Sequence, residues 1–247
     1  MSDPIAPPSA PTAPTGAEMS TGETLTGVFF EPSRTFEALR ARPRFLVAAL
    51  IIFIMTCLVT AVMYMRVDMG QYIRDRIEKS PNAAQISEQQ KETQVRVGKM
   101  IGMVLIPLSV PIAIALGSAL YMLLVMAFGG SISYLKSVSV WTYSWLPPAA
   151  IGTLIALLVL FLKSPDSIVP ENLVATNPGA LLSEESSRVL VAFLRQIDIL
   201  RFYGLFLAAL GLRKVAKISS GAAWGVVLTL WILGLLFAVG SAALFGR

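Results

Sequence analysis

Four long stretches without a charged residue limit what this chain of 247 residues can fold into. They cover residues 45–65, 100–135, 137–162 and 218–246, and each can cross about 30 Å of hydrocarbon as a helix. The runs are continuously apolar rather than alternating, and a backbone in lipid must satisfy its own hydrogen bonds. They therefore predict membrane-spanning helices rather than the strands of a barrel.

Composition supports a membrane protein and excludes several kinds of site. Hydrophobic residues make up 55% of the chain and charged residues only 14%. The single cysteine, Cys57, excludes an intrachain disulfide or a cysteine cluster, and the absence of histidine removes His-dependent catalysis and His-ligated metals. The net charge is +5 without a basic run or basic-aromatic interleaving, so we expect no nucleic-acid partner. We also expect no cofactor, no bound metal, no catalytic residues and no enzymatic activity.

The beginning of the chain divides into two parts. Residues 1–27 are rich in Pro, Ala and Thr and poor in large apolar residues, which predicts a disordered tail without a cleaved signal peptide. A helix from Pro32 that ends before Pro43 would place Phe36 and Leu39 on one face. This predicts a short amphipathic N-terminal helix on the membrane surface, and a solvated turn leading into the first span is the alternative.

Aromatic residues and prolines stand out early in the third apolar run. Trp141, Tyr143 and Trp145 are typical of a membrane-interface belt. Pro147-Pro148 should bend or break the helix just after them, and such a break can line a binding cavity or serve packing alone.

A further stretch, residues 189–212, is apolar except for Arg195, Asp198 and Arg201. Its uncharged part has eleven residues, about 16 Å of helix, which is too short to cross the membrane. A helix beginning near Val189 is long enough, and the three charges then share one face, each arginine three residues from the aspartate. Exposed to lipid they would cost about 8 to 10 kcal/mol, so we expect neighbouring helices to cover them.

Three interpretations of this charged cluster remain open. The favoured one is an internal clamp that fixes helix packing; the others are a helix that enters at an angle, with Arg195 and Asp198 in the headgroup layer, and a pathway for a substrate or proton. Transport usually recruits further polar groups within the membrane, and the other spans offer only hydroxyls and prolines, which weighs against coupled transport. The small residues expected at helix-packing contacts are Gly204, Ala208, Gly221 and Gly225.

With this stretch included, the sequence predicts an all-α polytopic membrane protein, a bundle of five transmembrane helices. The spans are expected near residues 45–65, 100–128, 138–162, 189–212 and 219–245, with a polar helical hairpin over 66–99. Basic residues near the span ends favour a cytoplasmic N-terminus and a C-terminus on the other side. The expected cytoplasmic basic face consists of Arg40, Arg42, Arg44, Arg213, Lys214 and Lys217.

Two segments are similar to a known family. "VFFEPSRTFEALRARP" before the first span and "LRQIDILRFYGLFLAALGLRKVAKISSGAAWGVVL" across the last two resemble the bacterial branch of the Yip family, named for Ypt/Rab-interacting proteins. The resemblance implies five transmembrane helices in the bacterial inner membrane and a cytoplasmic N-terminus. Eukaryotic members are associated with vesicle traffic and Rab GTPases, but their Asp-Leu-Tyr-Gly-Pro motif is missing here, where Tyr203-Gly204 follows Arg201-Phe202.

These features together predict a non-enzymatic integral membrane protein that acts as a scaffold or adaptor in membrane organisation or trafficking. Its expected partners are the lipid bilayer and a membrane or cytoplasmic protein that binds residues 29–44 and 213–217, and a homo-oligomer is left open. The alternative is a small transporter or lipid-handling protein that uses the charged cluster together with the broken third helix.

Overall fold

The computed structural model describes residues 19–80, 82–183 and 186–245, and the regular elements within these ranges are all helical. The all-helical class predicted from the sequence is confirmed. The helices long and apolar enough to cross a membrane number four among the described residues: α3 (Leu46–Arg66), α5 (Glu88–Ala127), α6 (Tyr134–Leu162) and α9 (Ser220–Phe245). They correspond to the four charge-free runs.

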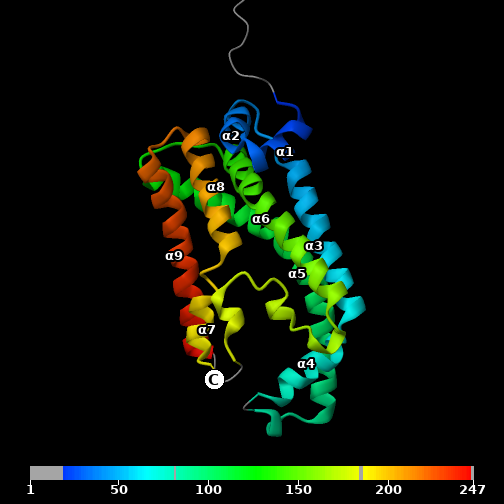
Figure 1. Ribbon diagram of the computed structural model, residues 1–247. Helices are drawn as coiled ribbons and strands as arrows, with labels where there is room; N and C mark the ends of the chain where they lie inside the picture. Colours follow the sequence, from blue (N-terminus) through cyan, green and yellow to red (C-terminus); the bar gives the residue numbers. More distant parts are fainter. Residues whose placement is uncertain (1–18, 81, 184–185, 246–247) are drawn as a thin grey trace, which may run out of the picture.

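The long helices form a bundle with α6 in a central position (Figure 1). Helix α6 packs against α3, α5 and α8 (Ile199–Ala216), and α8 packs against α9. Two short helices, α1 (Thr21–Phe30) and α2 (Pro32–Ala41), lie at one end of the bundle, whereas α4 (Met69–Glu78) and α7 (Arg188–Leu194) lie toward the other. Short 3₁₀ turns occupy Ala83–Gln85, Pro165–Ser167, Pro170–Asn172 and Pro178–Leu181.

Small hydroxyl residues explain why α6 can contact so many neighbours. Ser137, Ser139, Thr142 and Ser144 are fully buried. The Ser139 hydroxyl donates to the Leu135 carbonyl of its own helix at 2.9 Å, and the Ser137 hydroxyl donates to the Ser118 carbonyl of α5 at 2.6 Å. Side chains of this size let backbones approach closely, and the three serine hydroxyls pair with backbone carbonyls. The first half of α6 is therefore a packing surface rather than a lipid-facing one.

Helix α6 is continuous through Pro147 and Pro148, so the predicted break is absent. Each proline removes one backbone donor, but the helix here is enclosed by α3, α5 and α8, whose packing holds it in place. The predicted interfacial belt is also wrong. Tyr143 is only 1% exposed, and its hydroxyl pairs with that of Thr24 in α1 at 3.1 Å.

Helix α1 corrects the expectation of disorder up to residue 27. It begins with a capping box, in which the Ser20 hydroxyl accepts from the Glu23 N–H at 3.2 Å and the Glu23 carboxylate accepts from the Ser20 N–H at 2.6 Å. Val28 of α1 is fully buried against the bundle. The prediction of disorder is therefore wrong from Thr21 to residue 27, where the chain is helical. Residues 1–18 of the predicted tail lie outside the described residues.

Helix α2 appears where the sequence predicted an amphipathic helix, but its apolar face contacts protein. Phe36 and Leu39 are fully buried in the core that α2 shares with α6 and α8. A side chain at Gly211 of α8 would come within 2.8 Å of the Phe36 ring, so only glycine leaves room for it. We name α1 and α2 together the cap, and the cap packs against one end of the bundle through its buried apolar face.

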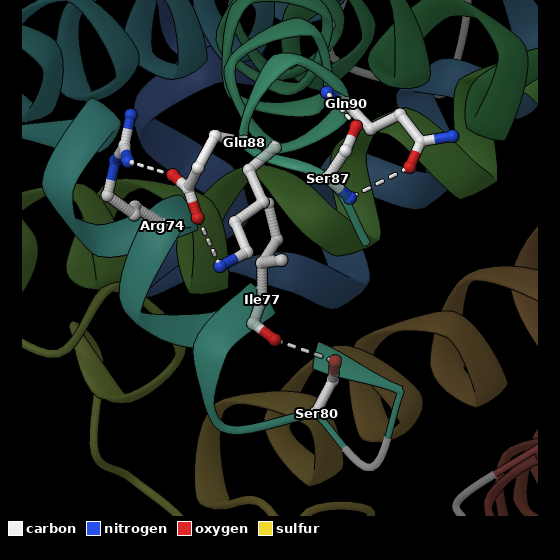
Figure 2. Close-up of polar contacts among 7 residues, drawn as sticks. Arg74, Ile77, Ser80, Ser87, Glu88 and Gln90 are labelled. Atoms are coloured by element: carbon white, nitrogen blue, oxygen red, sulfur yellow. Dashed lines mark hydrogen bonds and ion pairs between the residues drawn. The ribbon is translucent and has the colours of Figure 1, made fainter. Parts of the chain in front are cut away.

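The polar segment 66–99 forms the helical hairpin that the sequence predicted, except that α4 is separated from α3 by a turn. Helix α5 begins within this segment at a second capping box, made by Ser87 and Gln90 (Figure 2). Figure 2 also shows Glu88 accepting from Arg74 at 3.4 Å, which links α4 to α5. From this polar end, α5 continues for 40 residues and includes most of the second apolar run.

The connector between α6 and α7 (residues 163–187, described as 163–183 and 186–187) folds back against the bundle over its described residues. Its side chains Ile168 and Leu173 are buried in a cluster with Met63 of α3 and Leu160 of α6. Arg66, at the end of α3, donates to the carbonyl of Leu160 at 3.0 Å and to that of Lys163 at 3.4 Å. In Figure 1 this yellow-green segment connects two sides of the bundle. Helices α7 and α9 lie on one side of it, and α3 and α5 lie on the other.

Candidate functional site

The predicted fourth span is two helices rather than one. Helix α7 ends at Leu194 and α8 begins at Ile199, so the expectation of a continuous helix with charges in its middle is wrong. Asp198 is extended, with φ −121° and ψ 131°, and its carboxylate accepts from the Arg201 N–H at 2.9 Å. A short acidic side chain that caps the following helix competes with helical backbone, which explains why the chain breaks here.

Asp198 and Arg195 find partners in the connector. The Thr176 hydroxyl donates to Asp198 Oδ2 at 2.6 Å, Asn177 Nδ2 donates to the same oxygen at 3.4 Å, and the Ile199 N–H donates to the Thr176 carbonyl at 3.2 Å. Arg195 Nη2 donates to Asn172 Oδ1 at 3.1 Å. The expected mutual pairing on one helix face is thus replaced by contacts between the break and a distant loop.

The break lies beside the middle of α9. Trp231 Nε1 donates to the Gln196 carbonyl at 3.3 Å, and its ring lies 5.7 Å from that of Phe202. Trp231 follows the first residue of α9 by eleven positions, about 17 Å along the helix axis. Irregular backbone at the depth of a membrane span is tolerated only where protein buries it or where it lines a wet cavity.

A cavity of about 560 Å³ adjoins the break. One side of it is charged, with Arg195, Asp198 and Arg201, and continues into the polar connector residues. The other side is mainly apolar. Its remaining lining residues are Ile52, Ser109, Val110, Ala113, Ile114, Trp141, Trp145, Pro148, Ala149, Val174, Thr176, Asn177 and Leu200. Elements far apart in the sequence therefore build one amphipathic site.

The tryptophans of this site are held by glycines on neighbouring helices. A Cβ on Gly117 of α5 would collide with the Trp141 ring, and one on Gly204 of α8 would lie 3.0 Å from Trp145. The Trp141 ring also lies 4.8 Å from Tyr121. Gly204 thus allows the close approach of α8 and α6, and the aromatic side chains point into the protein instead of forming an interface belt.

The other predicted packing residues differ in their surroundings. Ala208 is fully buried in the core between α8 and its neighbours. A Cβ on Gly225 of α9 would collide with Phe128, so this glycine is also a close contact. Gly221 faces open space, so it contributes no helix contact within the described chain.

The predicted basic residues all lie around the cap end of the bundle. Lys214 Nζ lies 2.6 Å from Glu37 Oε1, and this hydrogen bond lowers the pKa of Glu37. Arg44 donates to the Met19 carbonyl at 3.1 Å and to the Thr21 hydroxyl at 3.3 Å. The remaining basic residues of this group are Arg40, Arg42, Arg213 and Lys217. Part of the basic face therefore fastens the cap to the bundle.

Sequence reasoning missed the connector's contribution. Asn172, Thr176 and Asn177 carry the polar partners of the charged cluster. Asn177 before Pro178 is a signal for a turn, and a turn signal was the most that the sequence offered. The pairing with Asp198 joins residues more than twenty positions apart, and local patterns do not report such contacts.

The fold and this site define a polytopic helical membrane protein with an amphipathic cavity, and no group of residues suited to a metal ion occurs among those described. A family model, the Yip1 domain, matches residues 26–241. The chain therefore belongs to the Yip1 domain family, whose members are linked to vesicle trafficking and are generally non-enzymatic. The resemblance inferred from the two segments is confirmed at the level of this family. No curated protein and no solved structure matches the chain.

Proposed function

We propose that this Yip1-domain protein is a non-enzymatic adaptor in membrane organisation or trafficking, and that its cap binds the partner protein. The observation that supports this best is the rigid attachment of the cap. Phe36 and Leu39 anchor α2 in the core, Thr24 of α1 pairs with Tyr143, and Glu37 pairs with Lys214. A surface fixed in this way loses little conformational entropy when a partner binds.

The outer side of the cap has the chemistry of a protein-binding surface. Phe30, at the end of α1, is 84% exposed. Beside it, Glu31 and Arg34 form an exposed ion pair at 3.0 Å. A large aromatic with a polar rim is typical of residues that dominate binding energy at protein interfaces. Exposed Arg213 and Lys217 lie at the same end and would favour an acidic partner or anionic lipid headgroups.

The proposal includes a bacterial inner-membrane location with five crossings. Helices α7 and α8 both pack against α9, one after the other along its length, so together they would form one discontinuous crossing. The basic residues at the cap end support a cytoplasmic N-terminus. Reporter fusions at the two termini should locate them on opposite sides of the membrane, and both termini on one side would refute the five-crossing arrangement.

The adaptor function can be tested by affinity capture in mild detergent. Phe30→Asp combined with Arg34→Glu alters the exposed side of the cap without touching its buried face. Proteins that co-purify with the wild type should be lost in this variant and retained in Asp166→Lys, a surface change at the opposite end of the bundle. The proposal would be contradicted if the wild type purified alone. It would also be contradicted if the cap variant captured the same proteins as the wild type and Asp166→Lys. Capture of a second copy alone would indicate a homo-oligomer instead.

The cavity favours a second candidate function, lipid handling. Its charged side suits the headgroup of an amphiphile and its apolar side suits the acyl chain. An adaptor that binds its partner through the cap needs neither side of the cavity. Transport of a small solute receives less support, because the polar groups in the described spans are mainly hydroxyls that bond to backbone carbonyls of α5 and α6.

A further inference from the structure

We propose that the cavity bordered by α5, α6 and α8 binds an anionic phospholipid whose headgroup carries a hydroxyl group. Arg195 and Arg201 would bind the phosphate, Asn177 would accept from the hydroxyl, and the tryptophan side would contact the first part of an acyl chain. This inference rests on the membrane placement proposed above, and it requires no protein partner.

The charges of the cavity favour an anion. Arg195 and Arg201 contribute two positive charges and Asp198 one negative charge, so the sum is +1. Asp198 is also occupied on both oxygens, since Oδ1 accepts from the Arg201 N–H and Oδ2 from Thr176. The carboxylate is therefore engaged in capping α8 and holding the connector. The positive charge of the guanidinium groups remains for a ligand.

Two polar atoms at the charged side are buried without a hydrogen-bond partner in the described structure. One is the Nε donor of Arg195 and the other is the Oδ1 acceptor of Asn177. The orientation of the Asn177 amide follows from chemistry, because its Nδ2 faces Asp198, whose carboxylate only accepts. A buried group that lacks a partner is costly. Both residues line the cavity, so a phosphate oxygen would satisfy the donor and a headgroup hydroxyl would satisfy the acceptor once these side chains turn toward the ligand.

The apolar side gives the site its affinity for an acyl chain. Trp141, Trp145 and Pro148 of α6 line it together with Val110 and Ile114 of α5. An inorganic anion would leave this side in contact with water. Apolar surface buried by a ligand contributes about 25 cal/mol per Å².

The cavity also has access to the bilayer. Ser109 and Ala113, which line it from α5, are exposed on the surface of the bundle. Around them on α5, Leu105, Leu108 and Ile112 are 52%, 45% and 49% exposed, as expected for side chains that face lipid. An acyl chain can therefore reach the tryptophans from the side, while the connector supplies polar groups to the headgroup.

Binding can be measured on the purified full-length protein in a neutral detergent. Dioctanoyl phosphatidylglycerol is the probe, and dioctanoyl phosphatidylcholine is the reference, because its zwitterionic headgroup has a phosphate but no net charge and no hydroxyl. Fluorescence of the cavity tryptophans and thermal unfolding both report binding. We expect the apparent Kd for phosphatidylglycerol to be at least about tenfold lower than for phosphatidylcholine, because the choline ammonium cancels the charge of its phosphate and offers no hydroxyl to Asn177.

Variants separate the anion-binding role from a structural one. Arg201→Gln and Arg195→Gln should each weaken phosphatidylglycerol binding about tenfold or more. They should weaken phosphatidylcholine binding less, because the choline ammonium already offsets the attraction of its phosphate for the arginines. Because these variants can also affect folding, Ala113→Trp provides a second test that fills the mouth of the cavity from an exposed position. It should weaken binding with an unchanged unfolding temperature, whereas Ala115→Trp, on α5 outside the cavity, should bind normally.

Three results would overturn the proposal. One is equal affinity of the wild type for the two lipids, and another is a phosphatidylglycerol preference that survives in Arg201→Gln and Ala113→Trp. The third is equal stabilisation by inorganic phosphate alone, which would show that the apolar side is not used. Failure of the proposed function would instead appear in the reporter fusions and capture experiments, which do not depend on this titration.

Discussion

Asp198 joins the break between α7 and α8 to the connector, so replacing it should loosen both. In Asp198→Ala, the first turn of α8 loses its capping acceptor, and the connector loses the 2.6 Å hydrogen bond from Thr176. Asp198→Asn keeps one acceptor oxygen but not two. It can therefore still cap α8 or accept from Thr176, but it cannot do both with oxygen.

The expected cost follows from these contacts. Loss of an N-cap destabilises a helix by about 1 kcal/mol, and a hydrogen bond to a charged group contributes about 1.5 to 3 kcal/mol. We therefore expect Asp198→Ala to destabilise the protein by about 3 kcal/mol, and Asp198→Asn by about half of that. For a chain of this size, about 3 kcal/mol corresponds to a fall of about 6 to 12 °C in the unfolding temperature.

Thermal unfolding of the purified variants in detergent, followed by tryptophan fluorescence, measures this effect. The matched control is Asp68→Ala, because Asp68 also caps a helix, accepting from Gly70 and Gln71 at 2.9 and 3.1 Å, and both of these bonds stay within α4. Asp198→Ala should lower the unfolding temperature by clearly more than Asp68→Ala and should expose residues 163–187 to limited proteolysis. Equal effects of the two variants would refute the role of Asp198 as a tether.

Further expectations concern the cap. Phe36→Ala should destabilise the protein by about 3 to 5 kcal/mol in thermal unfolding, because a fully buried ring is lost, whereas Phe30→Ala should change stability by less than about 0.5 kcal/mol. Gly211→Ala should cost about 1 to 3 kcal/mol by overpacking against Phe36, while Gly221→Ala, in open space, should be neutral or stabilising; similar effects would contradict the packing. The hydrogen bond from α8 holds the pKa of Glu37 below its ordinary value of 4.5, so its stabilisation, about 0.2 to 1 kcal/mol at this exposed site, is present above pH 4.5 and lost as pH falls below it. Glu37→Gln should remove that part of the pH dependence in unfolding scans, and an unchanged pH profile would show that the pair contributes nothing.

The apolar spans were predictable from the sequence because their signal is local. A run of charge-free residues such as 45–65 must form a helix if it lies in lipid, whatever its neighbours are. The helix around Phe36 and Leu39 was predictable for the same reason, from its prolines and its period. Its environment was not, because an apolar helix face can pack equally on lipid or on protein, and only the fit of Phe36 beside Gly211 decides between them.

The charged cluster shows the limit of the same reasoning. The sequence indicated that Arg195, Asp198 and Arg201 require a covered or polar environment, since charges exposed to lipid are costly. It did not reveal that the chain leaves the helix at Asp198, because that depends on Thr176 and Asn177, which are distant in sequence.

The amino-acid sequence by itself determined a helical membrane protein with a basic end and a charged interruption, because hydropathy, length and charge act within a single segment. Only the tertiary structure decided that the interruption is a helix break, that the tryptophans point inward, and that a cavity joins them. These features arise from contacts among α5, α6, α8 and the connector, and the energy of such contacts depends on how separate segments fit together.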